Sequence, residues 1–179
     1  MDKKQFNSIT KEIFLEYGFK KQKDSYILYL DKITIIVKFR SWRGVKSFNY
    51  WFFLNDLYDD SVKFEKRGDT KIEHKMEHSP ELRGYHRHEI LYEEWAEEEY
   101  RELLNKMLHS YFDPYKDNAI QFLKDNERLL LLTEKARIYL GFEPYKKPTR
   151  ILRNGKWVSE ENHINPFKKE QMIKEIIRL

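Results

Sequence analysis

Hydrophobic residues first recur at helical spacing along the chain and then switch to strict alternation. Near the N-terminus, a helix ending at Gly18 is predicted by one apolar stripe: Phe6, Ile9, Ile13, Phe14 and Tyr17. From Ser25 to Asp56 the period becomes two, as in Ile33, Ile35, Val37 and Phe39. Polar breaks at Asp31 and Gly44 divide this stretch, so the pattern predicts three strands of an antiparallel meander.

A weaker alternation beyond the meander predicts further strands. One is the short run 62–65, and another is 72–78, where Ile72, His74, Met76 and His78 would share a face. Residues 85–91 are the expected partner of the second run. The polar loop 79–84 between them would then turn a hairpin, so residues 70–91 are expected to be extended.

The second half of the chain returns to helical spacing. A broad apolar stripe runs from Trp95 to Tyr111, and a later run, 129–140, ends at Gly141. Between them, Asp113 is a good N-cap and Pro114 a good first helical residue, so a new helix is predicted to start there.

Residues 143–179 differ in composition from the rest. They contain three of the five prolines, a hairpin signal at Asn154-Gly155, and Asn165-Pro166 before a last amphipathic piece. The sequence therefore predicts one α+β domain over residues 1–142, with an N-terminal helix, an antiparallel sheet and a helical second half packed on one face. Residues 143–179 are predicted to form a C-terminal arm with a short hairpin and a terminal helix.

Composition narrows the function classes. The chain has no cysteine, so disulfides, thiolate metal sites and cysteine nucleophiles are excluded, and no apolar run is long enough to span a bilayer. We expect a cytoplasmic protein without a membrane partner. The net charge of +4 is segregated: residues 1–46 carry 11 basic and 5 acidic side chains, residues 47–141 carry 14 and 20, and residues 142–179 carry 9 and 5. Basic ends can lie against an acidic middle, which argues against a nucleic-acid partner.

The opening segment resembles a known family. An amphipathic helix closed by Gly18-Phe19-Lys20-Lys21, then Tyr26 and aromatic-rich strands, is similar to an uncharacterised bacterial family of unknown function. The resemblance covers roughly the first 60 residues, with a vaguer similarity in the Trp95 helix. It implies an α+β fold and supplies no catalytic residue.

Four of the six histidines lie within fifteen residues, at His74, His78, His86 and His88. On a strand, His74 and His78 would be about 13 Å apart, too far for one ion, whereas His86 and His88 would be about 6.6 Å apart on one side. His78 could complete a three-nitrogen zinc site across the ladder, with Glu89 as a candidate base. The alternative is that these are exposed or hydrogen-bonded polar side chains at a sheet edge.

Two other groups of residues suggest contact surfaces. Arg40, Trp42 and Arg43 combine guanidinium groups with an indole, as single-strand nucleic-acid binders do, although the same residues can pack a sheet rim. An acidic run is typical of the solvent-exposed face of a helix, and it could also be a docking surface for a basic partner. It consists of Glu93, Glu94, Glu97, Glu98, Glu99 and Glu102.

No catalytic signature is intact. The glycines are too far apart for a phosphate loop, and the zincin-like His88-Glu89 pair has Tyr92 where a second histidine is required. We therefore expect a non-enzymatic binding module that uses its sheet surface or acidic helix to hold a protein or a small ligand, with no cofactor. A metal-dependent hydrolase built on His78, His86 and His88 is the first alternative, and single-stranded nucleic-acid binding is the second. The oligomeric state stays open.

Overall fold

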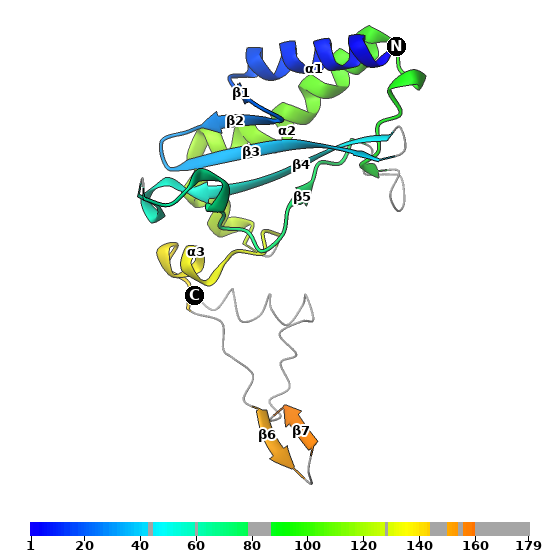
Figure 1. Cartoon of the computed structure of the whole chain (residues 1–179). Coiled ribbons are helices and arrows are strands. Elements are labelled where there is room, and N and C mark those ends of the chain that lie inside the picture. Colours follow the sequence, from blue (N-terminus) through cyan, green and yellow to red (C-terminus); the bar gives the residue numbers. More distant parts are fainter. Residues whose placement is uncertain are drawn as a thin grey trace.

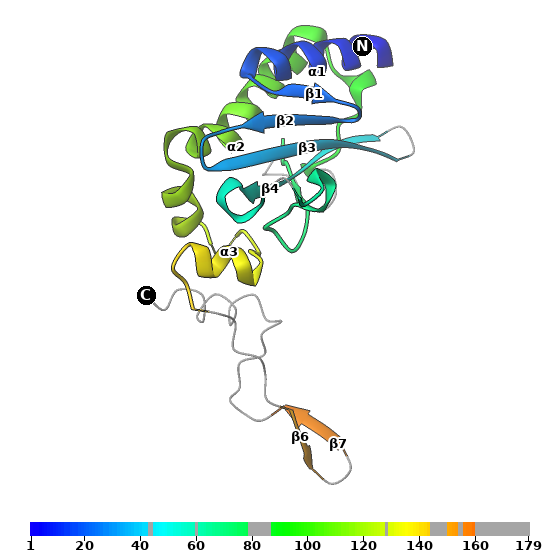
Figure 2. The same ribbon diagram turned by 60° about the vertical axis from the view of Figure 1, so that its left-hand side comes forward.

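A computed structural model describes residues 1–42, 45–59, 61–78, 87–127, 129–143, 150–153 and 156–159, with Trp42, Glu65 and the residues from 150 onward described by their backbone alone. Helix α1 (Lys3–Tyr17) and the long helix α2 (Glu97–Asp125) cross one face of a five-stranded sheet (Figures 1 and 2). The short helix α3 (Glu134–Tyr139) follows α2 at one end of the sheet. The α+β fold predicted from the alternation of periods is confirmed.

Helix α1 forms as its sequence predicts. The carboxylate of Asp2 accepts hydrogen bonds from the backbone N–H groups of Lys4 and Gln5, which satisfies donors that have no partner within the helix. At the other end, Gly18 has φ of 113°, and the N–H of Phe19 reaches the carbonyl of Phe14 at 2.9 Å. This Schellman arrangement turns the chain into the first strand.

The sheet is antiparallel throughout, with strand order β1-β2-β3-β4-β5. Its central pair is fully in register from Ile33 opposite Leu54 to Trp42 opposite Val45. The three-strand meander is therefore confirmed, with a short extra strand at each edge. The strand bounds are β1 Lys20–Gln22, β2 Ser25–Tyr29, β3 Ile33–Trp42, β4 Val45–Leu54 and β5 His74–Lys75.

One further strand prediction is wrong, and another is confirmed only in part. The run 62–65 is not extended, because Phe64–Lys66 forms a 3-10 turn whose Phe64 ring packs edge-on against Phe53. In the run 72–78, strand pairing with β4 covers His74 and Lys75, the N–H of Met76 donates to the carbonyl of Phe48 at 2.9 Å, and Ile72 is 51% exposed. Alternation of apolar and polar residues predicts an extended chain. It does not predict how many residues pair with the neighbouring strand, because that depends on how far the neighbouring strand extends.

Residues 70–91 are extended only in part where they are described. The chain returns after the undescribed residues 79–86, since the N–H of His78 donates to the carbonyl of Arg87 at 2.9 Å and Ile90 bridges Lys46 on β4. No α-helix occurs in the described parts of this stretch. The predicted pairing of His78 with His86 lies partly outside the described residues.

Helix α2 does not restart at Pro114 as predicted. The helix continues through the proline, and the break comes four residues later, at Asn118 with φ of −157° and ψ of 86°. Proline lacks the N–H that would reach the carbonyl of Ser110, which weakens the helix at this turn. Asn118 then caps the last part, because its side-chain oxygen accepts from the N–H of Gln121 at 3.1 Å.

One core fills the space between the helices and the sheet. Inward-facing strand residues such as Tyr26 and Phe52 pack against the buried stripes of α1 and α2. Thr10 and Tyr100 join the two helices inside this core through hydroxyls 2.7 Å apart. On the other face of the sheet, a smaller cluster contains Ile27, Ile36 and Phe53.

The buried Asp69 ties the sheet to α3. Its carboxylate accepts hydrogen bonds from the N–H of Leu54 at 2.8 Å, the hydroxyl of Tyr58 at 2.9 Å and the hydroxyl of Thr133 at 3.2 Å. Thr133 is also the N-cap of α3, which ends in a second Gly-Phe Schellman arrangement at Gly141. Burial raises the pKa of Asp69, while these hydrogen bonds lower it.

In the arm, the predicted hairpin is present as β6 (Arg150–Arg153) paired with β7 (Lys156–Ser159), with Leu152 opposite Trp157. The predicted terminal helix lies outside the described residues. The division of the chain at residue 142 stays a prediction. Among the described helices, none has an apolar stretch of the length that a bilayer requires.

Candidate functional site

The predicted zinc ligands make contacts with the backbone in the described part of the chain. His78 places Nε2 2.8 Å from the carbonyl oxygen of Glu89, and its ring meets Trp95 edge-on at 6.1 Å. His88 hydrogen-bonds to the backbone of Met76, while burial lowers its pKa. His86 lies outside the described residues, and no group of three histidine, aspartate or glutamate side chains within the described ranges is placed to hold a metal ion.

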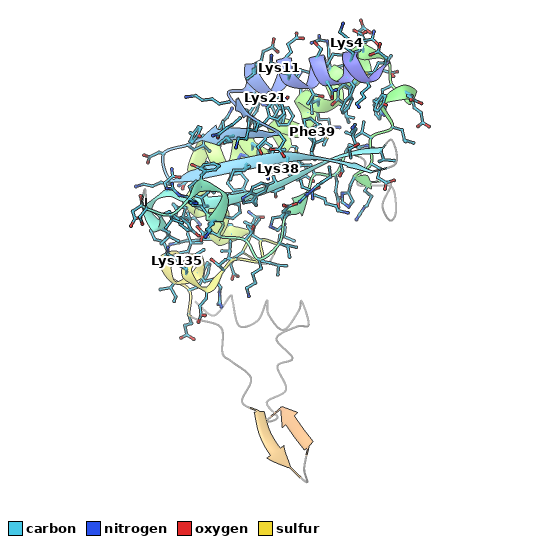
Figure 3. All side chains as sticks on the ribbon, viewed as in Figure 1. Lys4, Lys11, Lys21, Lys38, Phe39 and Lys135 are labelled. Carbon is cyan, nitrogen blue, oxygen red and sulfur yellow. The ribbon has the colours of Figure 1, made fainter. Side chains whose placement is uncertain are left out.

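The candidate nucleic-acid contact is only partly described. Arg40 is held by the carboxylate of Glu73 through two hydrogen bonds of 2.7 and 2.8 Å, which neutralises its charge. The backbone of Trp42 ends strand β3, and Arg43 lies outside the described residues. Lys38 on β3 (Figure 3) lies 5.2 Å from the ring centre of Trp51, on the sheet face opposite α2.

A cleft of about 730 Å³ lies between the β4–β5 edge of the sheet and α2. We call it the β5–α2 cleft. One wall comes from the strands, a second from α2 before its break, and a third from the chain after the break. Its lining is Tyr50, His74, Lys75, Glu77, His78, Leu103, Lys106, Met107, Ser110, Tyr111, Tyr115, Phe122, Asn126, Leu129 and Leu130.

The break at Asn118 explains why this cleft exists. A straight helix would carry residues after 118 along the line of its first half, whereas the break turns Phe122 and Asn126 toward the same hollow that Met107 and Ser110 line. The bent helix and the loop that follows it therefore enclose the cleft on the side away from the sheet.

Aromatic rings form the inner surface of the cleft. The ring of Tyr50 lies 5.8 Å from that of Tyr111 at 73° and 5.3 Å from that of His74 at 34°. Tyr115 meets Phe122 edge-on at 4.6 Å. Such ring contacts fix the side chains in place and give the cleft a preformed apolar surface.

The tyrosine hydroxyls in the cleft stay protonated at neutral pH. Burial raises the pKa of Tyr50 to about 12 and that of Tyr115 well above its ordinary value, and the buried hydroxyl of Tyr115 has no hydrogen-bond partner among the described residues. Burial also raises the pKa of Tyr111, whose hydroxyl accepts a hydrogen bond from the N–H of Glu77 at 2.7 Å. The cleft thus contains O–H donors and no phenolate.

His74 is neutral at physiological pH, because burial lowers its pKa. Its Nε2 is buried and has no hydrogen-bond partner among the described residues. A neutral imidazole beside tyrosines of raised pKa is a weak base surrounded by weak acids. At neutral pH the unprotonated ring can accept a hydrogen bond, and the tyrosine hydroxyls can donate one.

The charged side chains of the cleft come from two elements. Lys75 lies on β5 and Lys106 on α2, while the carboxylate of Glu77 forms an ion pair with Arg87 at 3.5 Å. Beside the cleft is a second hollow, of about 590 Å³, which shares Leu103 and Lys106 with it. That hollow contains part of the acidic run, namely Glu94, Glu99 and Glu102, around Trp95.

Most of the cleft residues were not predicted as a site from the sequence. Tyr50, Tyr111 and Tyr115 belong to apolar stripes, where their rings are ordinary core residues. The only signal was that the stripe of α2 carries hydroxyls four residues apart, at Tyr111 and Tyr115. Of the clustered histidines, His74 and His78 do line the cleft, His88 does not, and His86 is outside the described residues.

Comparisons of the chain with protein-family models, curated proteins and solved structures give no match. The family resemblance of the first 60 residues therefore stays an expectation.

Proposed function

We propose that this chain is a non-enzymatic binding module that holds a small ligand in the β5–α2 cleft. The observation that carries the proposal is the cleft itself: its volume of about 730 Å³ lies in the range that small-molecule sites occupy, and rings and aliphatic side chains alternate in its lining with a few polar groups. Neutral His74 and protonated tyrosines suit recognition by hydrogen bonding.

The alternatives receive less support from the geometry. A zinc hydrolase needs three ligands around one ion, and His78 and His88 belong to no such group among the described side chains. Nucleic-acid binding through Arg40 would require breaking its two hydrogen bonds with Glu73. Neither alternative has an observation of its own comparable to the cleft.

A cleft-filling substitution tests the proposal. Ser110 is exposed and lines the cleft, so Ser110→Trp should fill it without disturbing the core. We expect wild-type protein to bind the neutral aromatic probe 2-naphthalenemethanol saturably in a calorimetric or fluorescence titration. Ser110→Trp should weaken that binding at least about tenfold, which corresponds to 1.4 kcal/mol.

The matched control is Asn105→Trp, an equally exposed position of α2 that does not line the cleft. It adds the same indole to the same helix and should leave binding unchanged. Equal binding by both tryptophan variants would contradict the proposal, as would a wild type that binds neither this probe nor its charged analogues.

A further inference from the structure

The hydrogen-bonding groups of the β5–α2 cleft are mostly donors. Lys75 and Lys106 bring ammonium groups from the sheet side and the helix side, and the hydroxyl of Ser110 lies on the same helix. The one carboxylate in the lining belongs to Glu77, and it is ion-paired with Arg87 at 3.5 Å. Hydrogen bonds between charged donors and carboxylate or phosphate oxygens are about twice as strong as neutral ones.

The tyrosines add donors at the inner end. Because the hydroxyl of Tyr111 already accepts from the N–H of Glu77, its own proton remains for a further acceptor. The hydroxyl of Tyr115 is buried and has no hydrogen-bond partner among the described residues, so it too can donate its proton to a ligand. A ligand that supplies acceptor oxygens therefore matches this end of the cleft.

The acidic hollow next to the cleft limits where a negative charge can lie. Glu94, Glu99 and Glu102 repel an anion at the Trp95 end, whereas Lys75 and Lys106 attract one within the cleft. The two hollows meet at Lys106, so the field along the helix changes sign there. An anion would therefore be directed into the β5–α2 cleft rather than toward the Trp95 end of the helix.

The apolar part of the lining fits a flat, apolar group of a ligand. Rings of Tyr50, Tyr115 and Phe122 and the side chains of Met107 and Leu130 surround the interior. Aromatic rings favour offset or edge-to-face contact with another ring, which gives an aromatic ligand more contact energy than its area alone.

We propose that the ligand of the β5–α2 cleft is a small aromatic anion, such as an aromatic carboxylate, whose charged oxygens lie near Lys106 and the tyrosine hydroxyls while its ring lies among Tyr50, Tyr115 and Phe122. This inference rests on the proposed function, since it concerns the same cleft. It adds the chemical class of the ligand.

Three probes of the same shape and different charge distinguish the proposed binding function from the proposed anionic class of the ligand. They are 2-naphthoate, 2-naphthalenemethanol and 2-naphthylmethylammonium, each titrated into the full chain at pH 7.5 and low salt. We expect the carboxylate to bind at least about tenfold more tightly than the alcohol and the ammonium probe to bind most weakly, a difference of 1.4 kcal/mol per factor of ten. Higher salt should reduce the advantage of the carboxylate.

Two substitutions locate the charge effect. Lys106→Gln and Lys75→Gln each keep the side-chain length close to that of lysine, and we expect at least one of them to reduce the preference for the carboxylate over the alcohol to about threefold or less. Lys124→Gln is the control, because Lys124 is exposed on α2 and does not line the cleft. It should leave the preference intact.

The outcomes are distinguishable. If none of the three probes binds, the proposed function itself is wrong. If the alcohol binds as well as the carboxylate, or the ammonium probe binds best, the cleft is a binding site but the anionic class is wrong. Full retention of the preference in both Lys106→Gln and Lys75→Gln would also overturn the assignment of the class.

Discussion

At the scale of single residues, burial sets the chemistry of the cleft. His74 loses part of its contact with water beside Tyr50, so its pKa falls, while the pKa of Tyr50 rises to about 12 for the same reason. Desolvation disfavours the charged form of each group, which makes both of them neutral. The same residues exposed on an edge strand would titrate close to their ordinary values.

A pH dependence of stability follows from His74. Its pKa is lowered in the folded chain relative to the ordinary value of about 6.5, so below that pH the unfolded chain binds the proton more readily. Stability is therefore fully present above pH 6.5 and is lost as the pH falls. We expect His74→Phe, which cannot titrate, to lose less free energy of unfolding than the wild type between pH 7.5 and pH 5.

Urea unfolding followed by circular dichroism at several pH values measures this difference. At pH 7.5 the variant should lie within about 1.5 kcal/mol of the wild type, because phenylalanine fills a similar volume without a buried unpaired nitrogen. Part of the pH dependence of the free energy of unfolding should remain in both proteins, because the pKa of His88 is lowered too. Parallel pH profiles for variant and wild type would show that His74 is not buried as described.

At the scale of elements, the shape of α2 depends on one residue. Asn118 leaves the helical conformation and caps the part that follows, with its side-chain oxygen 3.1 Å from the N–H of Gln121. The break lets α2 follow the core and turns its last part toward the cleft. A helix that bends at a defined residue can therefore line two sides of a cleft, which a straight helix cannot do.

Two substitutions of the same type should have opposite effects on α2. Asn118→Ala removes the cap and should lower the free energy of unfolding by about 1 kcal/mol. Asn105→Ala, at an exposed position inside the first part of the helix, should raise it by roughly 0.5 kcal/mol, because alanine is the better helix former. Both values come from thermal or urea unfolding. Stabilisation by Asn118→Ala would mean that the break is not held by this cap.

At the scale of the whole molecule, a buried ion pair connects the end of α2 to α3. The guanidinium Nε of Arg137 lies 3.3 Å from a carboxylate oxygen of Glu127, and the two side chains are 0% and 2% exposed. Removing ions from water costs several kcal/mol per charge, so each member depends on the other. The pair links the chain just after α2 to α3, and Leu130, which lines the cleft, lies between its two members in the sequence.

Breaking the pair should be more harmful than replacing it. Arg137→Met alone should cost roughly 3–5 kcal/mol of unfolding free energy, because it leaves the Glu127 carboxylate buried without its cation. The double variant Glu127→Leu/Arg137→Met should recover a large part of that loss. A double-mutant cycle by urea unfolding measures the coupling, and simple additivity of the two single effects would contradict this account.

The candidate site was less predictable than the fold. Apolar spacing predicted α1, its end at Gly18, the three central strands and the α2 stripe, because periods of 3.6 and 2.0 are properties of the local chain. It overestimated the pairing of residues 72–78, and it placed the start of a new helix at Pro114 rather than the break at Asn118. Local signals also suggested a role for His78 and His88, but no sequence pattern indicated that Tyr50 and Tyr115 would line one cleft.

The sequence by itself determined the alternation of helix, sheet and helix, together with the absence of thiol chemistry, since these depend on residue type and spacing along one chain. Tertiary structure alone decided the cleft, because its walls come from strands and a helix that are far apart in sequence and meet only through the shared core. The protonation states within it were decided in the same way, as burial is a property of the folded packing and not of the residue.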